Sequence, residues 1–250
     1  MIQNAQSKQG LADYKGCIKD FLAVLSFAQE TGNKTWEASA CSNIGNAHKN
    51  LGNYQDAVKY HRKDLEIALQ LGDKRGENRA YSNICIAHSR FGNYQEALKY
   101  HQKLLEIALQ SGDKRGEASE YTKIGSAHHR LGNYHEALKY QQKLLEIVLE
   151  LGNKRGEGIA YGHIGNAHKN LGNYQEALQY HQKQLEIALQ LGEKDVAVIA
   201  YGQIGGDHQF LGNYQEALQY HQKSLKLALQ LGNKGLEGAA SLRRHWCCPF

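Results

Sequence analysis

A forty-residue repeat is the feature that most limits how this chain can fold. The decapeptide LGNYQDAVKY begins at Leu51 and returns with small changes at Phe91, Leu131, Leu171 and Leu211; a divergent copy, LADYKGCIKD, begins at Leu11. A second block, YSNICIAH from Tyr81, also recurs every 40 residues. A fixed period of this length is typical of stacked repeats, in which each unit buries its apolar face only against its neighbours.

Each repeat has the pattern of two helices. Apolar and aromatic residues recur three and four positions apart in both halves of the repeat, which is the spacing of a one-sided helical stripe. Leu-Gly-Asn separates the halves, as at residues 171–173. Gly172 can adopt the left-handed conformation that ends a helix, and Asn173 can cap the next helix. We therefore expect a helix pair in every period.

The expected fold is all-α, a right-handed superhelical α-solenoid of antiparallel helix pairs. Its expected parts are a degenerate half repeat at 1–32, five repeats at 33–72, 73–112, 113–152, 153–192 and 193–232, and a truncated repeat with an irregular tail at 233–250.

The repeated segment A-Y-x-x-I-G-N-A-H-x-x-L-G-N-Y-x-E-A-L-x-Y-H resembles the tetratricopeptide repeat (TPR) consensus. The consensus glycine falls on Gly45, Gly125, Gly165 and Gly205, and the small residue of the second helix falls on Ala57, Ala97, Ala137, Ala177 and Ala217. Histidine replaces several consensus aromatic residues, and the proline that ends the second helix is missing.

The long, 40-residue form is similar to the LGN/Pins family of G-protein-signalling modulators and to arrays of the tetratricopeptide repeat protein 28 type. This resemblance implies that an extended partner peptide binds along a concave groove lined by the first helices. The G-protein-binding motifs of the LGN/Pins family have no counterpart in this sequence, so no role with G proteins follows.

Composition argues against several classes of function. The formal net charge is only +5 and the basic residues are dispersed, which predicts no nucleic-acid partner. No apolar stretch is long enough to span a bilayer, so we expect no membrane partner. Five cysteines without C-x-x-C spacing indicate a reducing compartment, with the cytoplasm as the expected location. No motif for a cofactor is present, and none is expected.

The histidines are candidates for metal binding or catalysis, but their placement favours packing. Nine of them fall at two repeat-equivalent positions: His48, His88, His128, His168 and His208 in first helices, and His61, His101, His181 and His221 in second helices. A feature copied in every unit favours a structural role, and the H-E-x-x-H spacing of zinc enzymes is absent. We therefore expect a chain that is not an enzyme, with buried neutral histidines whose pKa values are lowered.

Function is expected where the repeats differ, on the exposed face of the first helices. The predicted peptide-binding residues are Asn43, Asn46, Lys49, Arg79, Asn83, Arg90, Lys123, Arg130, His163, Asn166, Ile199 and Phe210. Amides can bond a peptide backbone, and Arg and Lys attract carboxylates. The fifth repeat is more apolar, with Val198 and Ile199. These features predict an acidic, extended or partly helical partner segment with an apolar element near the fifth repeat.

Three other interpretations remain open at this point. The variable face can be solvated surface without a ligand. The array can be the sensor of a larger protein whose effector is absent, or it can associate with itself head to tail through exposed end repeats. Cys247 lies fourth from the end, as in prenylation signals, but Pro249 fits that signal poorly.

Overall fold

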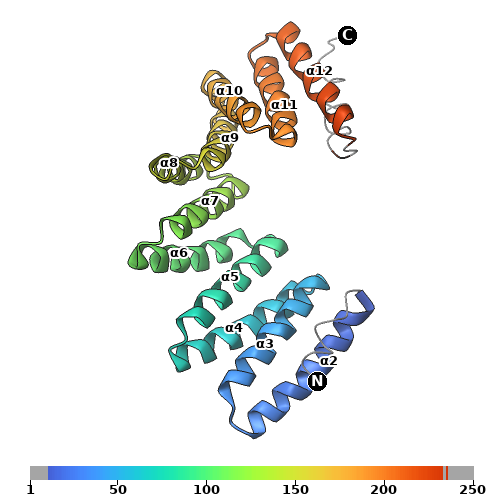
Figure 1. Ribbon diagram of the computed structural model, residues 1–250, viewed down its shortest axis with the longest axis vertical. Coiled ribbons are helices and arrows are strands. Elements are labelled where there is room, and N and C mark those ends of the chain that lie inside the picture. Colours follow the sequence, from blue (N-terminus) through green and yellow to red (C-terminus); the bar gives the residue numbers. More distant parts are fainter. Residues whose placement is uncertain (1–10, 233–234, 236–250) are drawn as a thin grey trace. The chain divides into compact units, whose positions relative to one another are not determined.

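The computed structural model describes residues 11–232 and residue 235, and every regular element in that range is an α-helix (Figure 1). The chain divides into two compact units, residues 1–113 and residues 114–250. Unit 1 contains α2 (Leu11–Glu30), α3 (Lys34–Asn50), α4 (Tyr54–Leu71), α5 (Lys74–Phe91) and α6 (Tyr94–Ser111). Unit 2 contains α7 (Lys114–Arg130), α8 (Tyr134–Glu150), α9 (Lys154–Asn170), α10 (Tyr174–Gln190), α11 (Lys194–Phe210) and α12 (Tyr214–Leu231).

Within each unit, successive helices run antiparallel and pack side by side (Figure 1). The expected all-α class and stacked helix arrangement are therefore confirmed. First helices (α3, α5, α7, α9 and α11) alternate with second helices (α4, α6, α8, α10 and α12). The predicted truncated repeat at 233–250, with its cysteine near the end, lies outside the described residues apart from Gly235.

One isoleucine per repeat lies at the centre of the packing. Ile44, Ile84, Ile124, Ile164 and Ile204 are all completely buried. The alanines of the second helices are buried too, and their small side chains let neighbouring helices approach closely. The apolar stripes that repeat along the sequence therefore form the core of both units.

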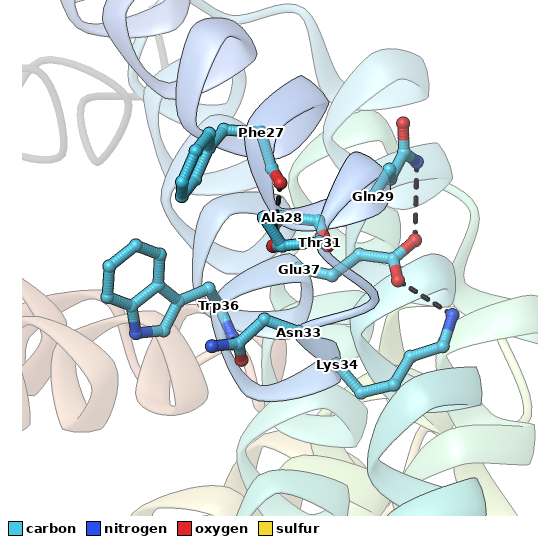
Figure 2. A network of polar contacts seen from close by, with 8 residues as sticks. All are labelled: Phe27, Ala28, Gln29, Thr31, Asn33, Lys34, Trp36 and Glu37. Atoms are coloured by element: carbon cyan, nitrogen blue, oxygen red, sulfur yellow. Dashed lines mark hydrogen bonds and ion pairs between the residues drawn. The ribbon is translucent and has the colours of Figure 1, made fainter.

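The junction between α2 and α3 shows how polar groups hold two helices together at a tight turn. Figure 2 shows Gln29 and Lys34 both reaching Glu37, at 3.2 and 2.8 Å. The hydroxyl of Thr31 donates to the carbonyl oxygen of Phe27. In the same pair of helices, the buried cysteines Cys17 of α2 and Cys41 of α3 belong to one apolar cluster.

The glycines that follow the helices behave as predicted, whereas the asparagines only partly do. Gly172 has a φ of +82°, and a glycine with positive φ ends each of the other described helices. Asn33 and Asn153 cap α3 and α9 through their side chains. The prediction was wrong for the second helices: Asn173 and its equivalents make no side-chain cap hydrogen bond. Their ψ values near +65° differ from the extended backbone typical of a capping residue.

Both repeated sets of histidines lie in packing positions. The first-helix histidines stack on tyrosines of the following helix, with ring centroids 5.4–5.9 Å apart, in the pairs His48–Tyr60, His88–Tyr100, His128–Tyr140, His168–Tyr180 and His208–Tyr220. Burial lowers the pKa values of His88, His128 and His168. A metal or catalytic role is not needed to explain these residues.

The second-helix histidines lie against the consensus glycines. A Cβ atom on Gly45 would come within 2.6 Å of the ring of His61, and Gly165 faces His181 in the same way. In the third repeat Gln141 replaces this histidine and lies against Gly125. Burial lowers the pKa of His61 to about 4.

Candidate functional site

The first helices of unit 1 enclose a hollow of about 720 Å³. Asn43 and Asn46 line it from α3, and Arg79 lines it from α5. The remaining lining residues are Thr35, Ala38, Ser39, Ser42, Ala68, Leu71 and Asp73. Three of the predicted binding residues therefore share one surface.

Arg79 is held by the carboxylate of Asp64, which was not among the predicted binding residues. A guanidinium nitrogen of Arg79 donates to Oδ1 of Asp64 at 3.1 Å, and the side chain of Asp64 is completely buried in α4. Burial raises the pKa of Asp64, and the charge of Arg79 opposes that rise. The charge of Arg79 is thus partly compensated within the chain, so Arg79 is a weaker attractor for a ligand carboxylate than the sequence predicted.

Other predicted cations of the first helices also have partners. Lys49 donates to Oδ1 of Asn46 at 2.8 Å, and burial lowers its pKa. Lys123 in α7 lies 2.6 Å from a carboxylate oxygen of Glu120, which is itself buried. Asn83 is half-buried and Arg90 is exposed on α5.

In unit 2, α7 and α9 enclose an apolar hollow of about 560 Å³. Leu144 and Val148 of α8 are buried and line it, and the half-exposed Leu151 and Ile159 also line it. Ser119, Thr122 and Arg115 of α7 add polar groups. None of these residues was among the predicted binding residues, although Ile159 occupies the repeat position of Arg79 and Ile199, which were predicted.

A second hollow between α7 and α9, of about 360 Å³, is polar. Three of the predicted residues line it together: Arg130, His163 and Asn166. His129 faces the same space, and its Nε2 lies 2.9 Å from the amide nitrogen of Asn170. Burial lowers the pKa values of both His129 and His163, which favours neutral rings near pH 7.

A third hollow of unit 2, about 700 Å³, lies between α9 and α11. Ile199 and Phe210, two of the predicted binding residues, line it together with the glycines Gly202 and Gly206. Phe210 stacks on Tyr174, with ring centroids 4.8 Å apart. Val198, by contrast, is buried and belongs to the core, so its expected place on the exposed face was wrong.

Lys169 projects into this third hollow from a fixed position. Its ammonium lies 3.7 Å from Oδ1 of the buried Asp207 and 5.2 Å from the ring centroid of Phe210. Asp207 also contacts Nδ1 of His181 at 2.5 Å. Asp207 stands where the other repeats have alanine, so this departure from the repeat was visible in the sequence although its partners were not.

The described residues offer little support for a metal site or a membrane span. Among them, no group of three or more His, Cys, Asp or Glu side chains is placed to hold a metal ion. The described helices also include none with the length and apolar character needed to cross a bilayer.

Comparison with known protein families decides the kind of repeat. Profiles described as tetratricopeptide repeat match residues 76–150, 117–190 and 156–230, and a further profile of that description matches residues 40–75. The chain belongs to the tetratricopeptide repeat family. Among curated proteins, no match to this TPR chain is found.

Solved structures with similar folds include several TPR proteins. A signal transduction ATPase with numerous domains (STAND) protein with a tetratricopeptide repeat sensor, from Pyrococcus horikoshii, is 22% identical with a TM-score of 0.77. That match covers 94% of this chain but only 36% of the archaeal chain. Aspartyl phosphate phosphatase F from Bacillus subtilis is 15% identical, with a TM-score of 0.77, over 88% of this chain and 58% of the other.

A third structure contains a repeat array of comparable length. It is a putative kinesin light chain with nearly identical TPR-like repeats from Podosopora anserina, 14% identical with a TM-score of 0.67. The match covers 79% of this chain and 97% of the other. At these identities the three structures establish the fold alone.

Proposed function

We propose that this TPR array is a non-catalytic scaffold that binds an acidic, extended or partly helical segment of a partner protein. Binding takes place on the faces of α7, α9 and α11 that enclose the three hollows of unit 2. The resemblance to LGN/Pins arrays supports an extended peptide as the ligand, and a cytoplasmic location is part of the same proposal.

The charge of the hollows in unit 2 is the main support. Arg115, Arg130 and Lys169 line them, and no carboxylate is among the lining residues described. Asp207 lies behind Lys169 and partly compensates its charge. Arg115 and Arg130 make no ion pair with any carboxylate in the described part of the chain, so they remain able to pair with acidic residues of a ligand.

Amide groups give the same surface a means of binding an extended backbone. Asn166 and Asn170 line both the second and the third hollow, so α9 connects the two. Within the chain, Oδ1 of Asn166 accepts from Gln203, and Nδ2 of Asn170 donates to the carbonyl oxygen of Asn166. The amide nitrogen of Asn166 can still donate to a carbonyl of a ligand peptide, and the amide oxygen of Asn170 can still accept from an N–H group. Charged and amide groups together therefore fit an acidic peptide better than an apolar helix.

A pair of charge-matched variants tests the proposal. In R115T/R130N, both arginines become residues that the chain itself uses at the equivalent positions, Thr35 and Asn170. In the control K99Q/K139Q, two exposed lysines of second helices become glutamine, as in Gln179 and Gln219. Both variants lose two positive charges, and only the first loses them from the hollows.

Partners are captured by crosslinking to the chain and identified by mass spectrometry. Peptides with the acidic segments of these partners are then synthesised, and their binding to the chain and its variants is measured by fluorescence anisotropy. We expect R115T/R130N to bind these peptides about tenfold more weakly or worse, and K99Q/K139Q to bind like the unaltered chain. Equal weakening in both variants would show general charge attraction and contradict the proposal.

A sensor array in a larger protein is the second candidate. Its support is the similarity to the archaeal STAND protein, whose own repeats are described as a sensor and of which this chain spans 36%. Coding sequence for an effector contiguous with this chain would favour this candidate. Head-to-tail self-association is a further alternative, and light scattering at increasing concentration would detect it as a rising mass.

A further inference from the structure

Two of the hollows occupy the same place in their repeats but differ in chemistry. One lies between α3 and α5 in unit 1, and the other lies between α7 and α9 in unit 2, 80 positions later. Ala38, Ser39 and Leu71 in the first correspond to Ala118, Ser119 and Leu151 in the second. Because the surrounding helices are equivalent, the lining residues that differ between the two hollows determine which ligand groups each hollow can bind.

The differences are concentrated at positions that carry charge in unit 1. Arg79 lines the first hollow and is paired with the buried Asp64, whereas Ile159 and Leu144 take those places in the second. Asp73 in the first is replaced by Asn153 in the second. An apolar ligand group entering the first hollow would lie against an ion pair and desolvate it, which is costly. The second hollow has no such ion pair in its lining, and its charged lining residue is Arg115, where the first hollow has Thr35.

The hollow of unit 2 is also open to a ligand. Leu144 and Val148 are 3% and 2% exposed and are part of the core. Leu151 and Ile159 remain 43% and 45% exposed, although both contribute to the lining. An apolar side chain placed between these two residues would remove their exposed surface from water, which is the main favourable contribution in apolar binding.

Positive charge lies beside this apolar surface. Arg115 lines the same hollow, and Arg130 lines the next hollow between the same two helices. Arg155 of α9 is already paired with Glu193, at 2.7 Å. The partner that fits this arrangement has an apolar residue with carboxylates next to it in sequence.

We infer that the hollow between α7 and α9 holds one aliphatic or aromatic side chain of the bound segment, flanked there by acidic residues that face Arg115 and Arg130. This inference rests on the proposed function and adds the side chain that the partner must carry. It places the apolar contact in the third and fourth repeats, where Leu151 and Ile159 lie, in addition to the apolar end near Phe210.

Selection from a phage-displayed library of random peptides on the full chain tests the inference. We expect the selected peptides to share an aliphatic or aromatic residue with acidic neighbours. The key variant is L151S/I159S, in which both residues become serine, as at Ser111 and Ser119. Synthetic versions of the selected peptides should bind it about tenfold more weakly or worse.

A double-mutant comparison assigns the contact. Changing the shared apolar residue of the peptide to alanine should weaken binding to the unaltered chain and have little further effect on L151S/I159S. The control L71S makes the equivalent change in the hollow of unit 1 and should leave binding unchanged. Thermal melting followed by circular dichroism verifies that each variant is folded. If L151S/I159S is unfolded, the single variant I159S, which alters one half-exposed residue, replaces it.

The possible failures are distinguishable. Selected peptides that bind L151S/I159S normally but lose affinity for R115T/R130N overturn this inference and leave the proposed function in place. Peptides without a shared apolar residue also overturn it. Selection of no peptides, or of peptides that are indifferent to both variants, overturns this inference and the proposed function together.

Discussion

At the scale of single residues, His61 is the side chain whose burial has the clearest consequence. It is completely buried, and neither ring nitrogen has a hydrogen-bond partner among the described residues. Its pKa is about 4 in the folded chain, against an ordinary value of 6.5. Below pH 6.5 the unfolded chain takes up a proton that the folded chain excludes, so stability falls as the pH is lowered from 6.5 towards 4.

We therefore expect H61Q to reduce the acid sensitivity of the chain. Glutamine already occupies this position as Gln141, so the variant should fold normally at pH 7.5. The fall in the free energy of unfolding between pH 7 and pH 4 should be smaller than in the unaltered chain by roughly 3 kcal/mol. Denaturant titrations at both pH values measure it, and Q141H should increase the fall. An identical pH dependence in all three proteins would contradict the predicted pKa effect.

The consensus glycines give a second prediction at this scale. A Cβ on Gly165 would lie 2.5 Å from the ring of His181, and that ring is held by Asp207. G165A should therefore cost about 1–3 kcal/mol of stability through overpacking. G125A brings its Cβ against the flexible end of Gln141, which can move, so it should cost less. Thermal melting of the two variants measures both losses of stability. An equal loss would show that the close approach of the helices, and not the rigidity of the facing side chain, determines the cost.

At the scale of helices, the fold could be predicted because its signals recur in every repeat. Gly172 and its equivalents end their helices, and the buried isoleucines follow the predicted stripe. Capping was less predictable, because Asn153 and Asn173 occupy similar sequence contexts but differ in ψ, at 86° and 67°. The preceding helices end alike, with ψ values of −5° at Leu151 and −3° at Leu171, so the Leu-Gly-Asn pattern does not distinguish the two asparagines.

The two asparagines provide a matched test at the level of the helix. Asn153 accepts a hydrogen bond from the backbone N–H of Gly156 at 3.0 Å, whereas Asn173 makes no side-chain cap bond. N153A should cost about 1 kcal/mol of stability, and N173A only a few tenths. Chemical denaturation resolves this difference, and a larger loss for N173A would mean that the capping geometry is reversed.

At the scale of the whole molecule, the site was less predictable than the fold. Repeat comparison marked Arg79 as variable, but its pairing with Asp64 depends on contacts between separate helices. Asp64 and Asp207 were nevertheless visible as charges at positions that are uncharged in every other repeat. The hollow at Ile159 was not predicted, because its buried lining residues Leu144 and Val148 have the apolar character of ordinary core residues. Residues that differ from their equivalents in the other repeats therefore indicate the candidate site best when the sequences of both the first and the second helices are compared between repeats.

The Asp64–Arg79 pair also tests whether stability is local in this chain, as nearest-neighbour repeat packing requires. R79I leaves the buried carboxylate without its cation and should cost about 2 kcal/mol, less than a fully buried pair because Arg79 is 50% exposed. D64L/R79I reproduces the pair Leu144 and Ile159 of unit 2 and should recover most of that loss. Hydrogen exchange should show the faster exchange of R79I in α3, α4 and α5, with α9–α12 unchanged. Uniformly faster exchange through α12 would mean that the chain unfolds as one cooperative unit. A double variant D64L/R79I as unstable as R79I would mean that Asp64 has a role beyond pairing with Arg79.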